Sequence, residues 1–160
     1  GNGSSNNITI NQSGNSSTQV NYADVTVTGN SNTVNITQQS TGGGKGAFVN
    51  VQNNNHSVVI QQKDSGSHYA EISVSGSPKS VDVTQQGSGS YLDLSLTGNG
   101  HNVSTNQKDA GSHKATINLT NAGGASTVNL VQQGATAQNI NITQQCATLS
   151  GCSVSVTQGN

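Results

Sequence analysis

Apolar and polar residues alternate along most of this chain, in short runs that end at a glutamine. Val34-Asn35-Ile36-Thr37-Gln38 and Val81-Asp82-Val83-Thr84-Gln85 are two of these runs. A period of two residues with β-branched side chains predicts a β-strand whose aliphatic residues and glutamine share one face. We expect that face to be buried, and therefore predict an inward ladder of seven glutamines: Gln12, Gln38, Gln62, Gln85, Gln107, Gln132 and Gln158.

The runs recur with a period of about 23 residues, and a period in the twenties is typical of a solenoid or array. An aliphatic residue stands two positions before each series glutamine, except that Thr105 takes this place in one repeat. A second series of aliphatic anchors lies between the glutamines: Val27, Val51, Val74, Leu96, Leu119 and Ile142. Each repeat therefore reads as strand, loop, strand and turn, which gives thirteen strands in all.

Two arrangements of these strands are compatible with the pattern. Neighbouring strands could pair as hairpins in a meander, or each strand could pair with its equivalent one repeat later. We expect the second arrangement, an all-β solenoid with two facing parallel sheets in register and about 6.5 two-strand rungs. The chain 1–160 then forms a single domain with repeats at roughly 6–29, 32–53, 56–76, 79–98, 101–121, 126–144 and 152–160.

Composition supports a long, thin core rather than a globular one. Hydrophobic residues make up 29% of the chain, aromatic residues 2% and charged residues 7%, with a net charge of -1. The chain contains no basic patch for nucleic acid and no apolar run long enough to span a membrane. In-register stacking places like residues above like, so a low charge is what this architecture requires.

Cys146 and Cys152 are the only cysteines, and we expect them to form a disulfide in a secreted protein. The pair could staple the last rung within one chain or link two subunits. The opening Gly1-Asn2-Gly3-Ser4 and the lack of methionine are what we expect of a chain whose leader has been removed.

The histidines suggest no metal centre. His56 and His101 occupy equivalent turns, and the motif Lys-Asp-x-Gly-Ser-His repeats at His68 and His113. Equivalents two rungs apart would lie about 10 Å from each other, too far for one ion. We expect all four to be solvated loop residues. No serine or cysteine has a histidine and an acid at a suggestive spacing, so we expect neither an enzyme nor a cofactor.

Parts of the chain resemble the curlin repeats of bacterial curli fibres. Ser126, Gln132 and Gly134 fit the start of that family's pattern, Ser-x5-Gln-x-Gly-x-Gly-Asn-x-Ala-x3-Gln, and Gln85-Gln86-Gly87-Ser88-Gly89 and Gln12-Ser13-Gly14 fit its Gln-x-Gly part. The family's leading serine is replaced in the other repeats by Asn6, Asn32, His56, Lys79, His101 and Cys152. The resemblance implies secretion across the outer membrane, self-assembly into extracellular amyloid fibres for biofilm and adhesion, and secretion and nucleation proteins as partners.

We therefore expect a structural subunit that stacks head to tail with copies of itself into a cell-surface fibre. Solenoids normally need capping ends, and neither end of this sequence has one. The odd number of strands leaves half a rung to be filled, for which residues 16–20 are a candidate. The alternative is a monomeric solenoid that binds ice or carbohydrate, the latter through Tyr22, Tyr69 and Tyr91. The subunit junction should involve Ile8, Ile10, Gln12, Ile142, Gln144, Val156 and Gln158.

Overall fold

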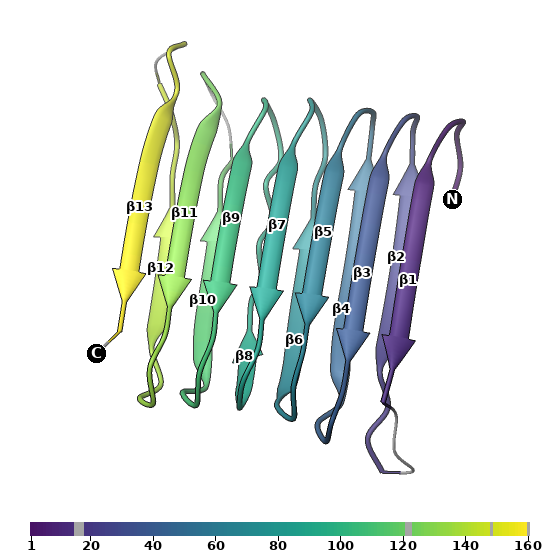
Figure 1. Ribbon diagram of the computed structural model, residues 1–160. Helices are drawn as coiled ribbons and strands as arrows, with labels where there is room; N and C mark the ends of the chain where they lie inside the picture. Colours follow the sequence, from purple (N-terminus) through teal and green to yellow (C-terminus); the bar gives the residue numbers. More distant parts are fainter. Residues whose placement is uncertain (15–17, 121–122, 148, 160) are drawn as a thin grey trace.

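The computed structural model describes residues 1–14, 18–120, 123–147 and 149–159, and this part of the chain forms thirteen β-strands and no helix. The strands follow one another along a single axis, with the two chain ends at opposite ends of the rod (Figure 1). Their bounds are β1 (Asn7–Ser13), β2 (Tyr22–Thr28), β3 (Thr33–Gln39), β4 (Lys45–Gln52), β5 (Ser57–Gln62), β6 (Ser67–Ser73), β7 (Ser80–Gln85), β8 (Gly89–Tyr91), β9 (Asn102–Gln107), β10 (His113–Asn118), β11 (Ser126–Gln132), β12 (Asn139–Thr143) and β13 (Cys152–Gln158).

The strands belong to two parallel sheets, which confirms the solenoid and excludes the meander. The odd-numbered strands form a seven-stranded sheet in the order β1-β3-β5-β7-β9-β11-β13, and the even-numbered strands form a six-stranded sheet. Each residue pairs with its equivalent one repeat later, as Ile36 does with Ile60 and Ile60 with Val83. Each expected repeat holds an odd strand and the even strand after it, except the last, which holds β13 alone; residues 15–17, 121 and 160 of those repeats lie outside the described residues.

The core is a single layer of aliphatic side chains between the two sheets. Along β3 the inward residues Val34, Ile36 and Gln38 are fully buried, whereas Thr33 and Asn35 on the other face are exposed. Val49 and Val51 of β4 fill the opposite side of the same layer. Each such aliphatic residue contributes about 1.5–3 kcal/mol by burial, so stability accumulates rung by rung.

Glycine and asparagine in the turns of the first two repeats explain why the even sheet lacks the glutamine there. The place in the even sheet that would match the series glutamine is occupied by Gly29 and Asn53 in the first two repeats. Both have positive φ, at 118° and 71°. This left-handed conformation favours glycine and asparagine over glutamine. A Cβ on Gly29 would also lie 1.9 Å from the Asn53 carbonyl oxygen of the next rung.

The even sheet is narrowest at β8, which is shorter than the alternation predicts. The three leucines that follow it remain inward and fully buried, but they lie outside the strand: Leu92, Leu94 and Leu96. The backbone turns to positive φ at Ser95, Leu96 and Thr97, with values of 73°, 66° and 87°. The regular pairing ends at Tyr91, and isolated backbone bonds follow it: the Leu92 N–H donates to the Tyr69 carbonyl at 3.0 Å and the Thr97 N–H to the Val74 carbonyl at 3.1 Å.

Candidate functional site

The seven series glutamines form one continuous ladder of amide hydrogen bonds inside the odd sheet. Each Nε2 donates to the Oε1 of the next glutamine, over distances from 2.6 Å at Gln12 to 2.9 Å at Gln107. The ladder runs unbroken through Gln12, Gln38, Gln62, Gln85, Gln107, Gln132 and Gln158. The five inner members are fully buried.

The second amide hydrogen crosses the core to the even sheet. Gln38 donates to the Tyr22 carbonyl at 2.9 Å, Gln62 to the Gly46 carbonyl at 2.7 Å and Gln85 to the Tyr69 carbonyl at 3.0 Å. Each inner glutamine thus uses both donors and its acceptor, so its burial leaves no unpaired group. The even sheet needs no glutamine of its own because its backbone carbonyls complete the network.

All six ladder bonds point in the same direction, toward the C-terminal end of the rod. Gln12 is exposed, and its Oε1 accepts no hydrogen bond from a described residue. At the other end, Gln158 Nε2 reaches only the Asn139 carbonyl, at 3.5 Å. The rod therefore ends in an acceptor at β1 and in a weakly engaged donor at β13.

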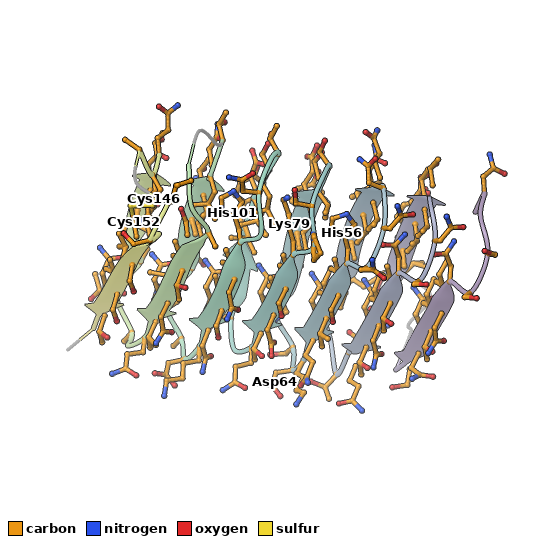
Figure 2. All side chains as sticks on the ribbon, turned by 90° about the horizontal axis from the view of Figure 1, so that it is seen from above. His56, Asp64, Lys79, His101, Cys146 and Cys152 are labelled. Carbon is orange, nitrogen blue, oxygen red and sulfur yellow. A yellow bond between two sulfur atoms is a disulfide. The ribbon has the colours of Figure 1, made fainter. Side chains whose placement is uncertain are left out.

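A second polar column crosses the odd sheet at the position where each strand begins. It lies at the opposite end of the strands from the glutamine ladder. It passes through Asn6, Asn32, His56, Lys79, His101, Ser126 and Cys152, and its labelled members lie in a row in Figure 2. Side chains in this column accept backbone N–H groups of the next rung. Asn32 Oδ1 accepts from the His56 N–H at 2.9 Å, and His101 Nδ1 accepts from the Ser126 N–H at 3.1 Å.

Lys79 occupies the centre of this column as a buried ammonium surrounded by turn carbonyls. Its Nζ donates to the carbonyls of Gly76, Gly98 and Asn99, the last two at 3.0 and 2.9 Å. Burial lowers its pKa to about 8. Burial also lowers the pKa of His56 and of His101, and the Lys79 charge lowers both pKa values further. Asn32, His101 and the caged Lys79 thus hold the column through hydrogen bonds to backbone groups.

The Lys-Asp-x-Gly-Ser-His motif forms a closed loop at the start of the even strands. His68 Nε2 bonds the Lys63 carbonyl at 2.7 Å, and His113 Nε2 bonds the Lys108 carbonyl at 2.8 Å. The intervening aspartate accepts a backbone N–H from the next rung, as Asp109 Oδ2 does from Gly134 at 3.0 Å. Burial lowers the pKa of His68 to about 4.

The expectation that the histidines are solvated is wrong, because all four are between 0 and 3% exposed. Local sequence placed them in turns, since each follows glycine, asparagine or serine. Their side chains nevertheless point inward, because the inward–outward alternation of side chains already applies where each strand begins. The signal that could have shown this is the column itself: buried Asn32, His56, Lys79 and His101 recur at one position of successive repeats.

The two cysteines form a disulfide within the chain, with their Cα atoms 5.7 Å apart. Cys146 follows β12 and is 2% exposed, whereas Cys152 opens β13. The bond therefore ties the last strand to the preceding rung. Of the two possibilities that the sequence left open, the structure contains the staple within one subunit (Figure 2).

The residues expected at the subunit junction lie at the two ends of the rod. Ile8 and Ile10 of β1 are 38% and 41% exposed, although their equivalents Val34 and Ile36 one rung inward are fully buried. Val156 and Gln158 of β13 are half-buried, and Ile142 of β12 is 8% exposed with the half-buried Gln144 beyond it.

The position beside β2 that a further even strand would fill is occupied by described residues only next to the C-terminal end of β2. Asn2 bridges Thr28 in parallel, donating to the Val27 carbonyl and accepting from the Gly29 N–H, both at 2.8 Å. Of the stretch 16–20 that we expected as a filler, residues 16 and 17 lie outside the described residues.

Within the described ranges, no group of three or more histidine, cysteine, aspartate or glutamate side chains could hold a metal ion. The same part of the chain contains no helix with the length and apolarity needed to cross a membrane. Comparisons with protein-family models, curated proteins and solved structures found no match to this chain.

Proposed function

We propose that this protein is the structural subunit of an extracellular, amyloid-like fibre in which copies stack end to end. The observation that carries the proposal is the pair of open ends. β1 and β13 each leave one edge without a strand partner among the described residues, and each carries an unfinished glutamine ladder. Open strand edges of this kind are templates for adding another chain.

The two ends are complementary in sequence register. In the repeat register, Val154, Val156 and Gln158 of one subunit would lie beside Ile8, Ile10 and Gln12 of the next. This contact buries the exposed isoleucines and lets Gln158 Nε2 donate to the free Gln12 Oε1. Because the ladder has a direction, joining two like ends would oppose two acceptors or two donors. The ladder therefore favours head-to-tail growth and a polar fibre.

The even sheet leaves a short gap at such a junction. Its terminal strands are β12 of one subunit and β2 of the next, and residues 1–3 already extend the even sheet beside the end of β2. The remaining slot faces half-buried Val25 and Ile140 and the buried Ile142. We propose that the subunit junction consists of these residues together with the odd-sheet contact. Secretion and nucleation partners and a cell-surface location follow from the resemblance to curlins.

Electron microscopy and fibre diffraction of the purified protein test this proposal. We expect unbranched fibres with a meridional spacing of about 4.8 Å. Ile10→Lys places a charge in the junction and should abolish elongation, because the charge would be buried without a partner. Thr9→Lys changes the neighbouring exposed residue on the outer face and should leave elongation intact. A protein that stays monomeric, or one whose two variants elongate equally, refutes end-to-end stacking.

The monomeric binding module remains the alternative outcome of that experiment. Ice binding suits a flat array of threonines, but one outward row of the odd sheet is mixed: Thr9, Asn35, Val59, Asp82, Ser104, Asn129 and Ser155. Thermal hysteresis by a non-elongating protein would nevertheless favour ice binding. That the protein is not an enzyme stays a prediction.

A further inference from the structure

All four aromatic residues of the chain gather in one strip on the outer face of the even sheet. The sequence contains three tyrosines, one phenylalanine and no tryptophan. Tyr22, Phe48, Tyr69 and Tyr91 belong to β2, β4, β6 and β8, and their successive ring centroids are 5.2, 5.5 and 5.2 Å apart. The strip is therefore about 16 Å long and parallel to the solenoid axis.

The strip is continuous only because of a glycine. Tyr22 and Tyr69 both pair in register with Gly46, so no side chain would stand between them. Phe48, two residues further along β4, fills this place and contacts both tyrosine rings. A Cβ on Gly46 would lie 3.2 Å from Tyr69 and 3.8 Å from the Phe48 ring, in the space that the aromatic rings use.

Carboxylates flank the rings on the same face. Asp24 and Glu71 are the register partners of Phe48, and Asp93 follows two residues after Tyr91. These are half of the six acidic residues of the chain, and no ion pair to any of the three occurs in the described part of the structure.

The three carboxylates give this face a negative charge that no ion pair within the described residues neutralises. Burial raises the pKa of Asp93, and repulsion from Glu71 raises it further. The Tyr69 hydroxyl donates to Glu71 at 2.7 Å, and this bond raises the pKa of Tyr69 to about 12, so its phenol stays neutral. The nearest cation in the register, Lys114, lies beyond the far end of the strip as the partner of Tyr91. A bound cation would relieve the repulsion between the carboxylates.

A shallow groove runs beside the Phe48 ring and provides room for a ligand. Its volume is about 280 Å³, and its lining includes Asp24, Phe48, Glu71 and the outward polar residues Asn50 and Ser73. The groove thus places the Phe48 ring beside the two carboxylates of Asp24 and Glu71.

We propose that the aromatic strip and its acidic groove bind a planar aromatic cation, lying along the solenoid axis. Aromatic side chains attract organic cations, and carboxylates without ion-pair partners provide the complementary charge. A neutral sugar is a poorer fit, because it brings no positive charge to the carboxylates that flank the rings. The site lies on the side of the rod, so it does not depend on the proposed assembly.

The test is equilibrium dialysis of thioflavin T, a planar aromatic cation, against unassembled protein with its disulfide intact. The triple variant Asp24→Asn, Glu71→Gln and Asp93→Asn should weaken binding about tenfold, since each exposed charge contributes modestly. The matched control changes the other three acidic residues to asparagine: Asp64, Asp82 and Asp109. It alters the net charge equally and should stay within twofold of the wild type.

Two further measurements separate this site from general adhesion to a sheet surface. Phe48→Leu should also weaken binding about tenfold, because it interrupts the strip while keeping an apolar side chain. Binding should fall as salt rises. Absence of binding, equal losses in the two triple variants, binding that is unchanged in Phe48→Leu, or displacement by cellohexaose would each overturn the proposal.

Discussion

Replacing Gln85 by glutamate tests the inner ladder most directly, because it changes one amide to a carboxylate of almost the same shape. Gln85 is fully buried, and its Nε2 donates to the Tyr69 carbonyl at 3.0 Å and to Gln107 Oε1 at 2.9 Å. The carboxylate loses both donations and places an oxygen against two acceptors. An unpaired buried acceptor costs about 1–3 kcal/mol, and a buried charge without a partner costs more. We expect a loss of about 3–5 kcal/mol, a large part of a typical folding free energy.

The control is Gln86→Glu at the next, half-exposed position, which changes the same charge outside the core. Urea unfolding followed by circular dichroism should show less than about 0.5 kcal/mol of change in this variant. Burial should raise the folded-state pKa of the glutamate at position 85 above its unfolded value near 4.3. Its penalty is then complete above the folded pKa and shrinks as the pH falls toward the unfolded one. A Gln85→Glu protein within 1 kcal/mol of the control at neutral pH would refute the buried ladder.

Three further changes test other parts of the rod. The pKa of His68 is lowered from 6.5 to about 4, so its contribution to stability should be complete above pH 6.5 and fall by about 3 kcal/mol as the pH drops to 4. Ring titration by NMR measures the pKa, and urea unfolding at each pH measures the stability. A pKa near 6.5 would contradict the burial. Changing Cys146 and Cys152 to serine should cost about 2 kcal/mol, and hydrogen exchange should show the loss concentrated in β13; equal loss in all rungs would contradict a terminal staple. Gly66→Ala puts a Cβ 2.3 Å from backbone atoms of the next rung and should cost more than about 2 kcal/mol, whereas Gly76→Ala, whose Cβ meets nothing closer than 3.8 Å, should be near neutral in the same unfolding assay.

The sequence was sufficient to predict the strands and their pairing because both depend on a repeated local signal. Alternation of the kind found in Val34-Asn35-Ile36-Thr37-Gln38 assigns each side chain to a face, and the constant period assigns each strand its partner. The same phase placed the glutamines inward. What it could not supply is the second hydrogen bond to the even sheet, because the bond from Gln85 to the Tyr69 carbonyl depends on how the two sheets face each other.

The buried cations and histidines were missed for a different reason. Lys79 and His56 follow turn residues and are polar, so local sequence favours exposure, yet both are buried. For Lys79, the closing turns provide carbonyls that replace its water. The aromatic strip was also hidden, because Phe48 is displaced by two residues from the tyrosine positions and joins them only through the space at Gly46. Both features arise between repeats rather than within one.

The short strand β8 has a mechanical consequence. In a stacked rod the backbone hydrogen bonds between strands run along the axis, so a force that pulls the two ends apart loads these bonds directly. β8 shares three register pairs with β6 and two with β10, whereas every other pair of neighbouring strands in the described residues shares five to seven. Under tension, the even sheet should part first beside β8, in the middle of the subunit, where the fewest of its bonds carry the load.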